Sequence, residues 1–167
     1  MNVYLASMDH FLYAFQQSYP QSSLIESENG ERNLLVQPLW QIDLGAAVVS
    51  NPVLYEEIIY VGTIDGKVHA IHTSDQMIIW SYAGIADAGS IWGTPVIMEE
   101  ALLYGDEKGN LFAISIEDGS PNWTSPYNAG ASIIASGVEV EEDEIFGRKL
   151  WKLPVPDMRH SFNLSLI

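Results

Sequence analysis

The chain has 167 residues, 22 acidic and 7 basic side chains, and a formal net charge of −15 at pH 7. Because nucleic acid and anionic membrane surfaces need a positive patch on the protein, this charge argues against both as partners. The composition is typical of a globular chain, no run reaches the ~18 to 20 apolar residues of a membrane span, and the absence of cysteine excludes disulfides and thiolate metal sites.

The first segment, residues 1–45, is expected to form an incomplete structural unit. Residues 3–7 and 11–15 are rich in aromatic and apolar side chains, which predicts two short strands. A polar insertion, residues 16–33, delays the outer strand, which we expect near Trp40. Because loops longer than ~15 residues are usually functional or disordered, this insertion is one candidate binding segment.

The next two segments, residues 46–88 and 89–131, are repeats of each other. An ungapped shift of 43 residues gives ten identities over 37 positions, well above chance, and they fall on turn formers and a tryptophan. The positions to which we assign a structural role are Gly62 and Gly105, Gly66 and Gly109, Ala70 and Ala113, and Trp80 and Trp123, together with Trp40 of the first segment.

Each repeat predicts four short strands. The second strand, residues 58–62 or 101–105, is almost entirely apolar, which favours burial on both faces. Gly66 and Gly109 are expected to supply a positive φ in the following hairpin turn. The outer strand is expected to end on Trp80 or Trp123.

The last two segments differ from the repeats. Residues 132–146 match only the start of a further unit, and residues 147–167 form an atypical basic tail with two prolines. The tail is either a polar terminal extension or not the natural continuation of what precedes it.

A period of 43 residues with four strands per unit predicts an all-β fold of β-propeller blades, an architecture similar to that of WD40 proteins. We expect the tryptophan rings to lie across blade interfaces, where the small alanines make room for them. Since a closed ring of six to eight blades needs roughly 250 to 350 residues, the ring is incomplete. Residues 1–146 therefore predict a partial propeller of three to four blades.

The repeats resemble the PQQ-like (quinoprotein-type) β-propeller family over residues 1–146. The matching phrases in the first full repeat are Asn51-Pro52-Val53, Tyr60-Val61-Gly62, Asp65-Gly66, His69-Ala70-Ile71 and Trp80. The sequence departs from the family pattern at His72 and Ser115, where the family commonly has an aspartate. The resemblance is specific for the repeat and carries over no catalytic residue.

The resemblance implies a non-catalytic segment that acts as a protein-interaction or ligand-binding scaffold, without a cofactor. The alternative is a fragment of a PQQ-dependent alcohol or sugar dehydrogenase, which would use PQQ and calcium. The partners it implies are a protein or the remaining blades of a longer propeller, and assembly of copies into a ring stays open. Family resemblance implies a periplasmic or extracellular location, although the chain as given carries no export signal.

One connecting loop, residues 83–92, is the main candidate interaction site, because Asp87, Ser90 and Trp92 combine polar and aromatic groups close to the expected ring axis. The histidines predict no metal site. His69 and His72 lie three apart in one strand and so point to opposite faces, and we expect them to be exposed or half-buried. The acidic run within residues 139–144 is interpreted as a solvated turn.

Overall fold

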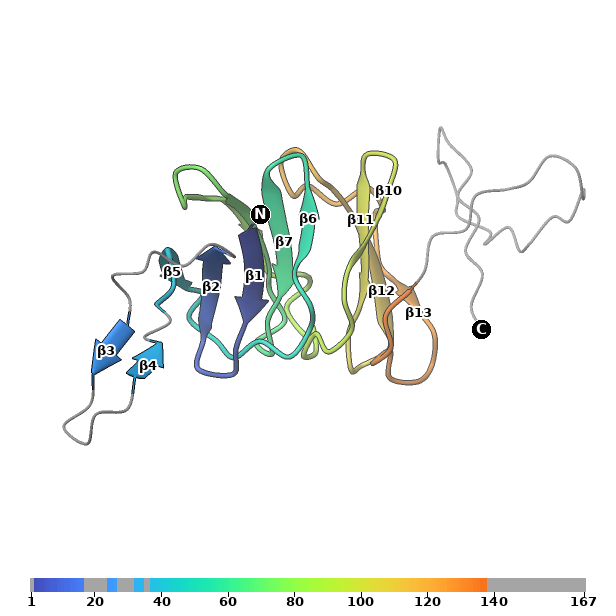
Figure 1. The fold of residues 1–167 in the computed structure, drawn as a ribbon. Coiled ribbons are helices and arrows are strands. Elements are labelled where there is room, and N and C mark those ends of the chain that lie inside the picture. Colours follow the sequence, from blue (N-terminus) through green and yellow to red (C-terminus); the bar gives the residue numbers. More distant parts are fainter. Residues whose placement is uncertain (1, 17–23, 27–31, 35–36, 138–167) are drawn as a thin grey trace, which may run out of the picture.

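All regular structure in the described residues is β-strand, as the repeat predicts. The computed structural model describes residues 2–16, 24–26, 32–34 and 37–137 (Figure 1). The strands are β1 (Asn2–Ala6), β2 (Phe11–Gln16), β3 (Leu24–Glu26), β4 (Arg32–Leu34), β5 (Trp40–Asp43), β6 (Val53–Tyr55), β7 (Ile58–Gly62), β8 (Val68–His72), β9 (Ile78–Tyr82), β10 (Val96–Met98), β11 (Ala101–Gly105), β12 (Asn110–Ser115) and β13 (Tyr127–Asn128).

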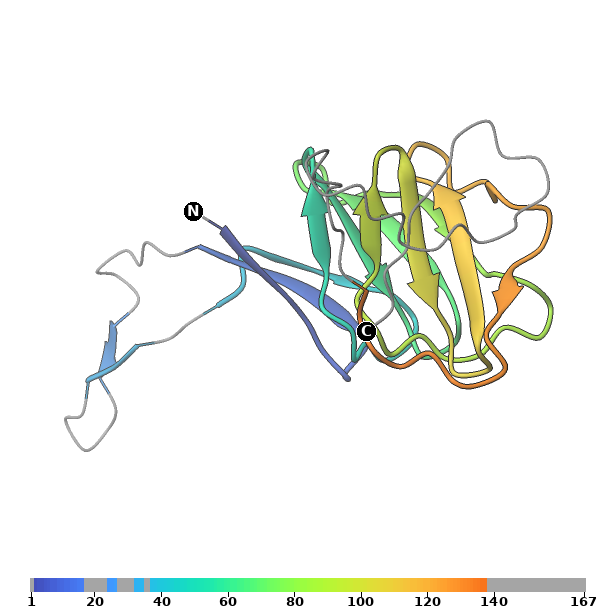
Figure 2. The ribbon, with the colours of Figure 1, turned by 90° about the vertical axis from the view of Figure 1, so that its right-hand side faces the viewer.

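Three antiparallel sheets stand side by side, with β3 and β4 forming a separate hairpin (Figures 1 and 2). The first sheet has the order β1-β2-β5, the second β6-β7-β8-β9 and the third β10-β11-β12-β13. Consecutive strands are neighbours in the two four-stranded sheets, so each repeat folds into one propeller blade. The sheets form an open arc, and the predicted all-β propeller architecture is confirmed.

The central strands are buried on both faces: β7 lies between the first and third sheets, and β11 packs against the second sheet on one face and near Trp123 on the other. In β7 and β11 nearly every residue is buried, as their unbroken apolar sequences predict. The turns that follow contain Gly66 with φ 81° and Gly109 with φ 85°, which confirms the expected left-handed conformation.

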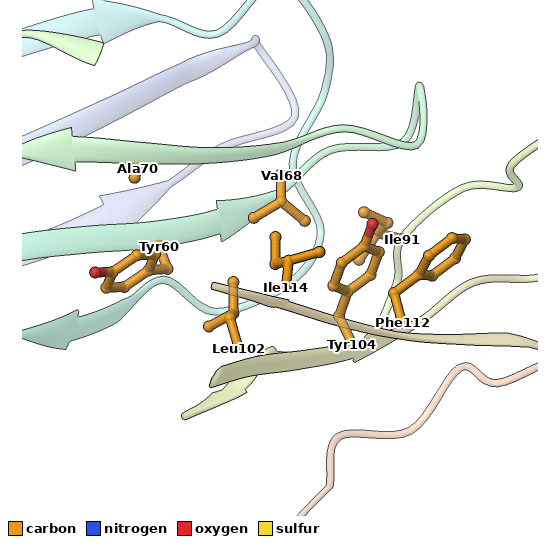
Figure 3. Packing of buried hydrophobic residues seen from close by; sticks show 8 residues of the cluster. All are labelled: Tyr60, Val68, Ala70, Ile91, Leu102, Tyr104, Phe112 and Ile114. Atoms are coloured by element: carbon orange, nitrogen blue, oxygen red, sulfur yellow. The ribbon is translucent and has the colours of Figure 1, made fainter. Parts of the chain in front are cut away.

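Two hydrophobic cores lie between the three sheets. The core between the first and second sheets consists of Leu12, Leu44, Val48, Ile59, Val61 and Ile71. The core between the second and third sheets consists of Tyr60, Val68, Ala70, Ile91, Leu102, Tyr104, Phe112 and Ile114 (Figure 3). Within it the rings of Tyr104 and Phe112 stack with centroids 4.8 Å apart. Each sheet is therefore stabilised by burial against its neighbour rather than by its own strands alone.

The tryptophan of the second sheet packs across the blade interface. Trp80 lies opposite Ala70 in the β8–β9 register. Its ring faces Gly119 of the third sheet, where a Cβ would lie 2.7 Å from the ring atom Cε3. In the first sheet Trp40 contacts the ring of Tyr4, with centroids 5.7 Å apart.

The predicted ends of the outer strands are wrong. Strand β9 continues past Trp80 to Tyr82, and Trp123 lies outside any strand although it is buried against Ala113. Pro121 still forms an isolated antiparallel bridge with Ile114, and the backbone N–H of Asn122 donates to the carbonyl of Ala113 at 2.8 Å. Since Pro121 and Pro126 have no backbone N–H to donate, this pairing does not continue as a regular strand, and the next strand is β13.

The polar insertion contains a feature that the sequence analysis did not predict. Strands β3 and β4 pair antiparallel, with Ile25 opposite Asn33. The basic tail 147–167, the acidic run 139–144 and most of the fourth unit, residues 132–146, lie outside the described residues.

Candidate functional site

Two connecting segments and the turns they meet form one end of the arc, the lower end in Figure 1. We call residues 44–52, between β5 and β6, the first connector, and residues 83–95, between β9 and β10, the second connector. The backbone N–H of Ile64 donates to the carbonyl of Ala47 at 3.0 Å, and that of Glu107 donates to the carbonyl of Ser90 at the same distance. Each connector is therefore held at a fixed place against the turn of the following sheet.

The buried carboxylate of Asp106 fastens the second connector to the third sheet. It accepts hydrogen bonds from the backbone N–H of Gly89 at 2.8 Å, Lys108 at 3.0 Å and Asn110 at 2.8 Å. The Asn110 side-chain amide donates a fourth at 2.9 Å. Because Asp106 is fully buried, this set of donors replaces the water that its charge would otherwise need. Of these donors Gly89 belongs to the connector, so its hydrogen bond fixes the connector against the β11–β12 turn.

The three residues singled out from the sequence all lie on this connector. Asp87 is exposed, and its carboxylate pairs with the ammonium of Lys108 at 2.5 Å. The indole N–H of Trp92 donates to a carboxylate oxygen of Glu107 at 3.3 Å. Ser90 contributes its backbone carbonyl to the turn, as described above. Asp87 and Trp92 are thus brought together through neighbouring residues of one turn in the third sheet.

Apolar side chains that are exposed or half-buried recur at the same position of successive connectors. Ile91 packs on Gly62, and Ile133 packs in the same way on Gly105. The next residue is Trp92 in one case, 46% exposed, and Ile134 in the other, 63% exposed. In the first connector the corresponding pair is Val48, which is buried, and Val49, which is half-buried. We call Val49, Trp92 and Ile134 the connector arc.

The repeat pattern alone does not predict the connector arc as a unit. The shift of 43 residues aligns Ile134 with Ile91, whereas the structure places Ile133 there, one residue earlier. A usable signal was present, since each connector carries two adjacent apolar residues, Val48-Val49, Ile91-Trp92 and Ile133-Ile134. The first of each pair faces the core and the second faces solvent or is half-buried.

His69 is buried, which corrects the expectation that it is exposed or half-buried. Only 5% of it is accessible, its Nδ1 lies 2.8 Å from the hydroxyl of Ser81, and its Nε2 is buried without a hydrogen-bond partner. Burial lowers the pKa of His69, so the ring is neutral at pH 7. His72, on the same strand, is half-buried, and His10 is exposed.

Among the described residues, no group of three or more histidine, aspartate or glutamate side chains is placed to hold a metal ion. The axial hollow between β6 and β10 offers one carboxylate, Glu99, among apolar side chains. Calcium prefers six to eight oxygen ligands, and PQQ, a polycarboxylate, needs cationic partners. The residues present here therefore do not fit PQQ with calcium.

Both lysines of the described residues form ion pairs. Lys67 pairs with Asp65 and Lys108 with Asp87, each at 2.5 Å.

None of the described segments is a helix with the length and apolar character needed to cross a membrane.

Comparison with known proteins places these observations in a family. A family model described as "Outer membrane protein assembly factor BamB" matches residues 36–148. A curated relative, the outer membrane protein assembly factor BamB of Yersinia pestis, is 27% identical over 89 residues, which is 52% of this chain. The aligned part is 23% of that relative, so the chain spans about a quarter of its length.

Solved structures share the fold at low identity. BamB from Moraxella catarrhalis superimposes with a TM-score of 0.60 and 15% identity, over 83% of this chain and 37% of that one. The quinohemoprotein alcohol dehydrogenase ADHIIG from Pseudomonas putida HK5 gives a TM-score of 0.54 and 20% identity, over 72% of this chain and 18% of that one. Identities this low show the propeller architecture alone.

Proposed function

Since this chain belongs to the family of the outer membrane protein assembly factor BamB, whose blades are PQQ-like β-propeller repeats, we propose that it acts as a non-catalytic, protein-binding module in assembly of the cell envelope. By the same reasoning, its site of action is periplasmic or extracellular. Shared fold alone would not support this step, because propellers serve both enzymes and scaffolds. The sequence match to an assembly factor is the reason for preferring the scaffold.

The observation that carries the proposal is the exposed indole of Trp92. Exposed aromatic side chains are common anchors in protein interfaces, particularly when their orientation is fixed before binding. Here the indole is held by Glu107, and the backbone beneath it is fixed by the buried Asp106. Little conformational entropy would be lost when a partner covers this ring.

The surroundings of Trp92 also suit a protein partner. Val49 and Ile134 extend the apolar surface along the arc, and the pair Lys108–Asp87 supplies a polar rim. Apolar anchors within a polar border are the usual arrangement of a protein–protein interface. We therefore assign binding to the connector arc, with Asp87 and Lys108 at its border.

Photo-cross-linking in living cells tests this proposal. The full chain is directed to the periplasm of a Gram-negative bacterium with a photo-cross-linking amino acid in place of Trp92. The matched control carries it in place of Met77, which is 64% exposed at the outer rim. We expect a discrete adduct with an envelope-assembly protein from position 92 and none from position 77. Equal adducts from both positions, or none from either, would overturn the proposal.

A further inference from the structure

A second surface lies at the ring axis, away from the connector arc. The innermost strands β6 and β10 border an open hollow of about 510 Å³. Its apolar lining consists of Val53, Leu54, Tyr55, Pro95, Val96 and Ile97. Leu54 is 53% exposed and Tyr55 39% exposed, so the hollow presents apolar surface to solvent. We call it the axial groove.

The axial groove is bordered by unpaired strand edges. Within the part of the chain that the structure describes, β6 pairs only with β7 and β10 only with β11. The other edge of each strand therefore has backbone N–H and C=O groups without strand partners. Such edges accept an extended peptide through main-chain hydrogen bonds, while apolar hollows between them take its side chains.

The charge at this end of the arc is negative. The β6–β7 turn carries Glu56 and Glu57, and the β10–β11 turn carries Glu99 and Glu100, all exposed. Both turns lie at the upper end in Figure 1, opposite the connectors, and Glu99 also lines the groove.

Neighbouring turns extend the acidic surface. Asp75 follows β8, and Glu117 and Asp118 follow β12, at the same end of the sheets. The lysines of the described part, Lys67 and Lys108, lie in the turns at the opposite end. The field at the mouth of the groove therefore favours a cationic partner.

The two glutamate turns keep an unfavourable backbone conformation. Glu56, Glu57 and Glu99 have φ values of 47°, 69° and 54°. In two-residue hairpin turns this left-handed conformation suits Asn-Gly far better than glutamate. Glutamates therefore occupy turn positions whose positive φ favours asparagine or glycine. Departures from such a local preference are common at functional sites.

We propose that the axial groove binds an extended peptide segment in which apolar and basic residues alternate. The peptide lies between the edges of β6 and β10, with its apolar side chains on Val53, Leu54 and Val96. Its lysine or arginine side chains reach Glu99 and the neighbouring glutamates. This site is separate from the connector arc, and it stands or falls independently of the function proposed above.

Fluorescence anisotropy with the full chain and short labelled peptides tests the proposal. A peptide of alternating valine and lysine should bind, and its affinity should fall as salt is added. A valine–glutamate peptide should not bind, and a serine–lysine peptide should bind at least about tenfold more weakly because it cannot fill the groove. Equal binding of the serine–lysine peptide would reduce the effect to general charge attraction and overturn the proposal.

Two variants separate binding from folding. Glu56→Asn/Glu57→Gly should raise the melting temperature, because Asn-Gly suits the left-handed turn. The same variant should lower the affinity for the valine–lysine peptide about fivefold, because two negative charges are removed. Leu54→Ser should weaken binding with the melting temperature retained. The control Asp43→Asn, which changes an exposed carboxylate next to the first connector, should leave peptide affinity unchanged. Unchanged affinity in both groove variants, or an equal loss in the control, would contradict the assignment.

Discussion

The indole N–H of Trp80 donates to the backbone carbonyl of Ile116 at 3.2 Å, so a side chain of the second sheet is hydrogen-bonded to the third. The hydroxyl of Tyr60 donates to the same oxygen, also at 3.2 Å. The rings of Trp80 and Tyr60 contact each other, with centroids 5.8 Å apart. One carbonyl thus receives two donors, and two blades are joined by polar as well as apolar contacts.

Trp80→Phe should therefore destabilise the protein by at least about 1 kcal/mol, because the N–H donor is lost and the smaller phenyl ring fills less of the blade interface. Tyr60→Phe should cost a similar amount. The double variant should cost more than the two single changes together, since the carbonyl then loses both donors. Urea unfolding of the four proteins measures this, and strict additivity would show that the two bonds are independent.

Gly119→Ala should destabilise more than Gly130→Ala. Both glycines have positive φ, 71° and 76°, so each substitution carries the same backbone penalty of about 1 kcal/mol. At Gly119 the new methyl would also meet the ring of Trp80, whereas nothing lies within 4 Å at Gly130. The difference between the melting temperatures of the two variants measures the contact between Gly119 and the Trp80 ring. Equal melting temperatures would mean that the ring does not contact this glycine closely.

Stability should fall as the pH drops below the ordinary histidine pKa of 6.5, because His69 is buried and neutral. Its pKa is lowered in the folded state, so the unfolded chain binds more protons in this range. Stability is thus complete above that pH and decreases below it.

His69→Phe should flatten this pH dependence, and Phe112 holds the corresponding place in the third sheet. Urea unfolding between about pH 5 and 7.5 measures the slope. His10→Gln, at an exposed position, serves as the control and should keep the slope of the parent protein. An unchanged slope in His69→Phe would place the titrating group elsewhere.

The repeat predicted the second sheet well because its turn glycines, apolar strand and tryptophan are regular in sequence. It did not predict the outer strand of the third sheet. There Trp123 still matches Trp80 in sequence, but Pro121 and Pro126 lack the backbone N–H groups that a regular strand would need. The repeat alignment also places Ile134, rather than Ile133, at the position of Ile91. An ungapped alignment cannot detect that Ile133 is the residue that packs on Gly105. The hydrogen bond of the buried His69 to Ser81 depends on the pairing of β8 with β9, which the repeat alignment does not give.

The sequence points to Asp87, Ser90 and Trp92 because they combine polar and aromatic groups in one loop near the expected ring axis, and their role stays a prediction. The structure adds their contacts with Glu107 and Lys108, which come from the next sheet. These contacts are far apart in sequence. An alignment of repeats matches equivalent positions only, so it cannot reveal a contact between a connector and a turn of the next sheet.

PQQ with calcium should leave both the tryptophan fluorescence and the melting temperature unchanged. The axial groove is apolar with acidic turns at its mouth, which would repel a polycarboxylate. Titration with PQQ in the presence of excess calcium checks this. Saturable quenching together with a higher melting temperature would favour the dehydrogenase alternative.

The most direct test of protein binding by the connector arc compares photo-cross-linking from all three arc positions with that from two exposed positions elsewhere. We predict the same adduct from positions 49, 92 and 134, and at least about tenfold less from positions 39 and 77, where Leu39 and Met77 are exposed outside both proposed sites. Adducts of equal yield at all five positions, or an adduct confined to positions 39 and 77, would contradict the assignment of the arc as the binding surface.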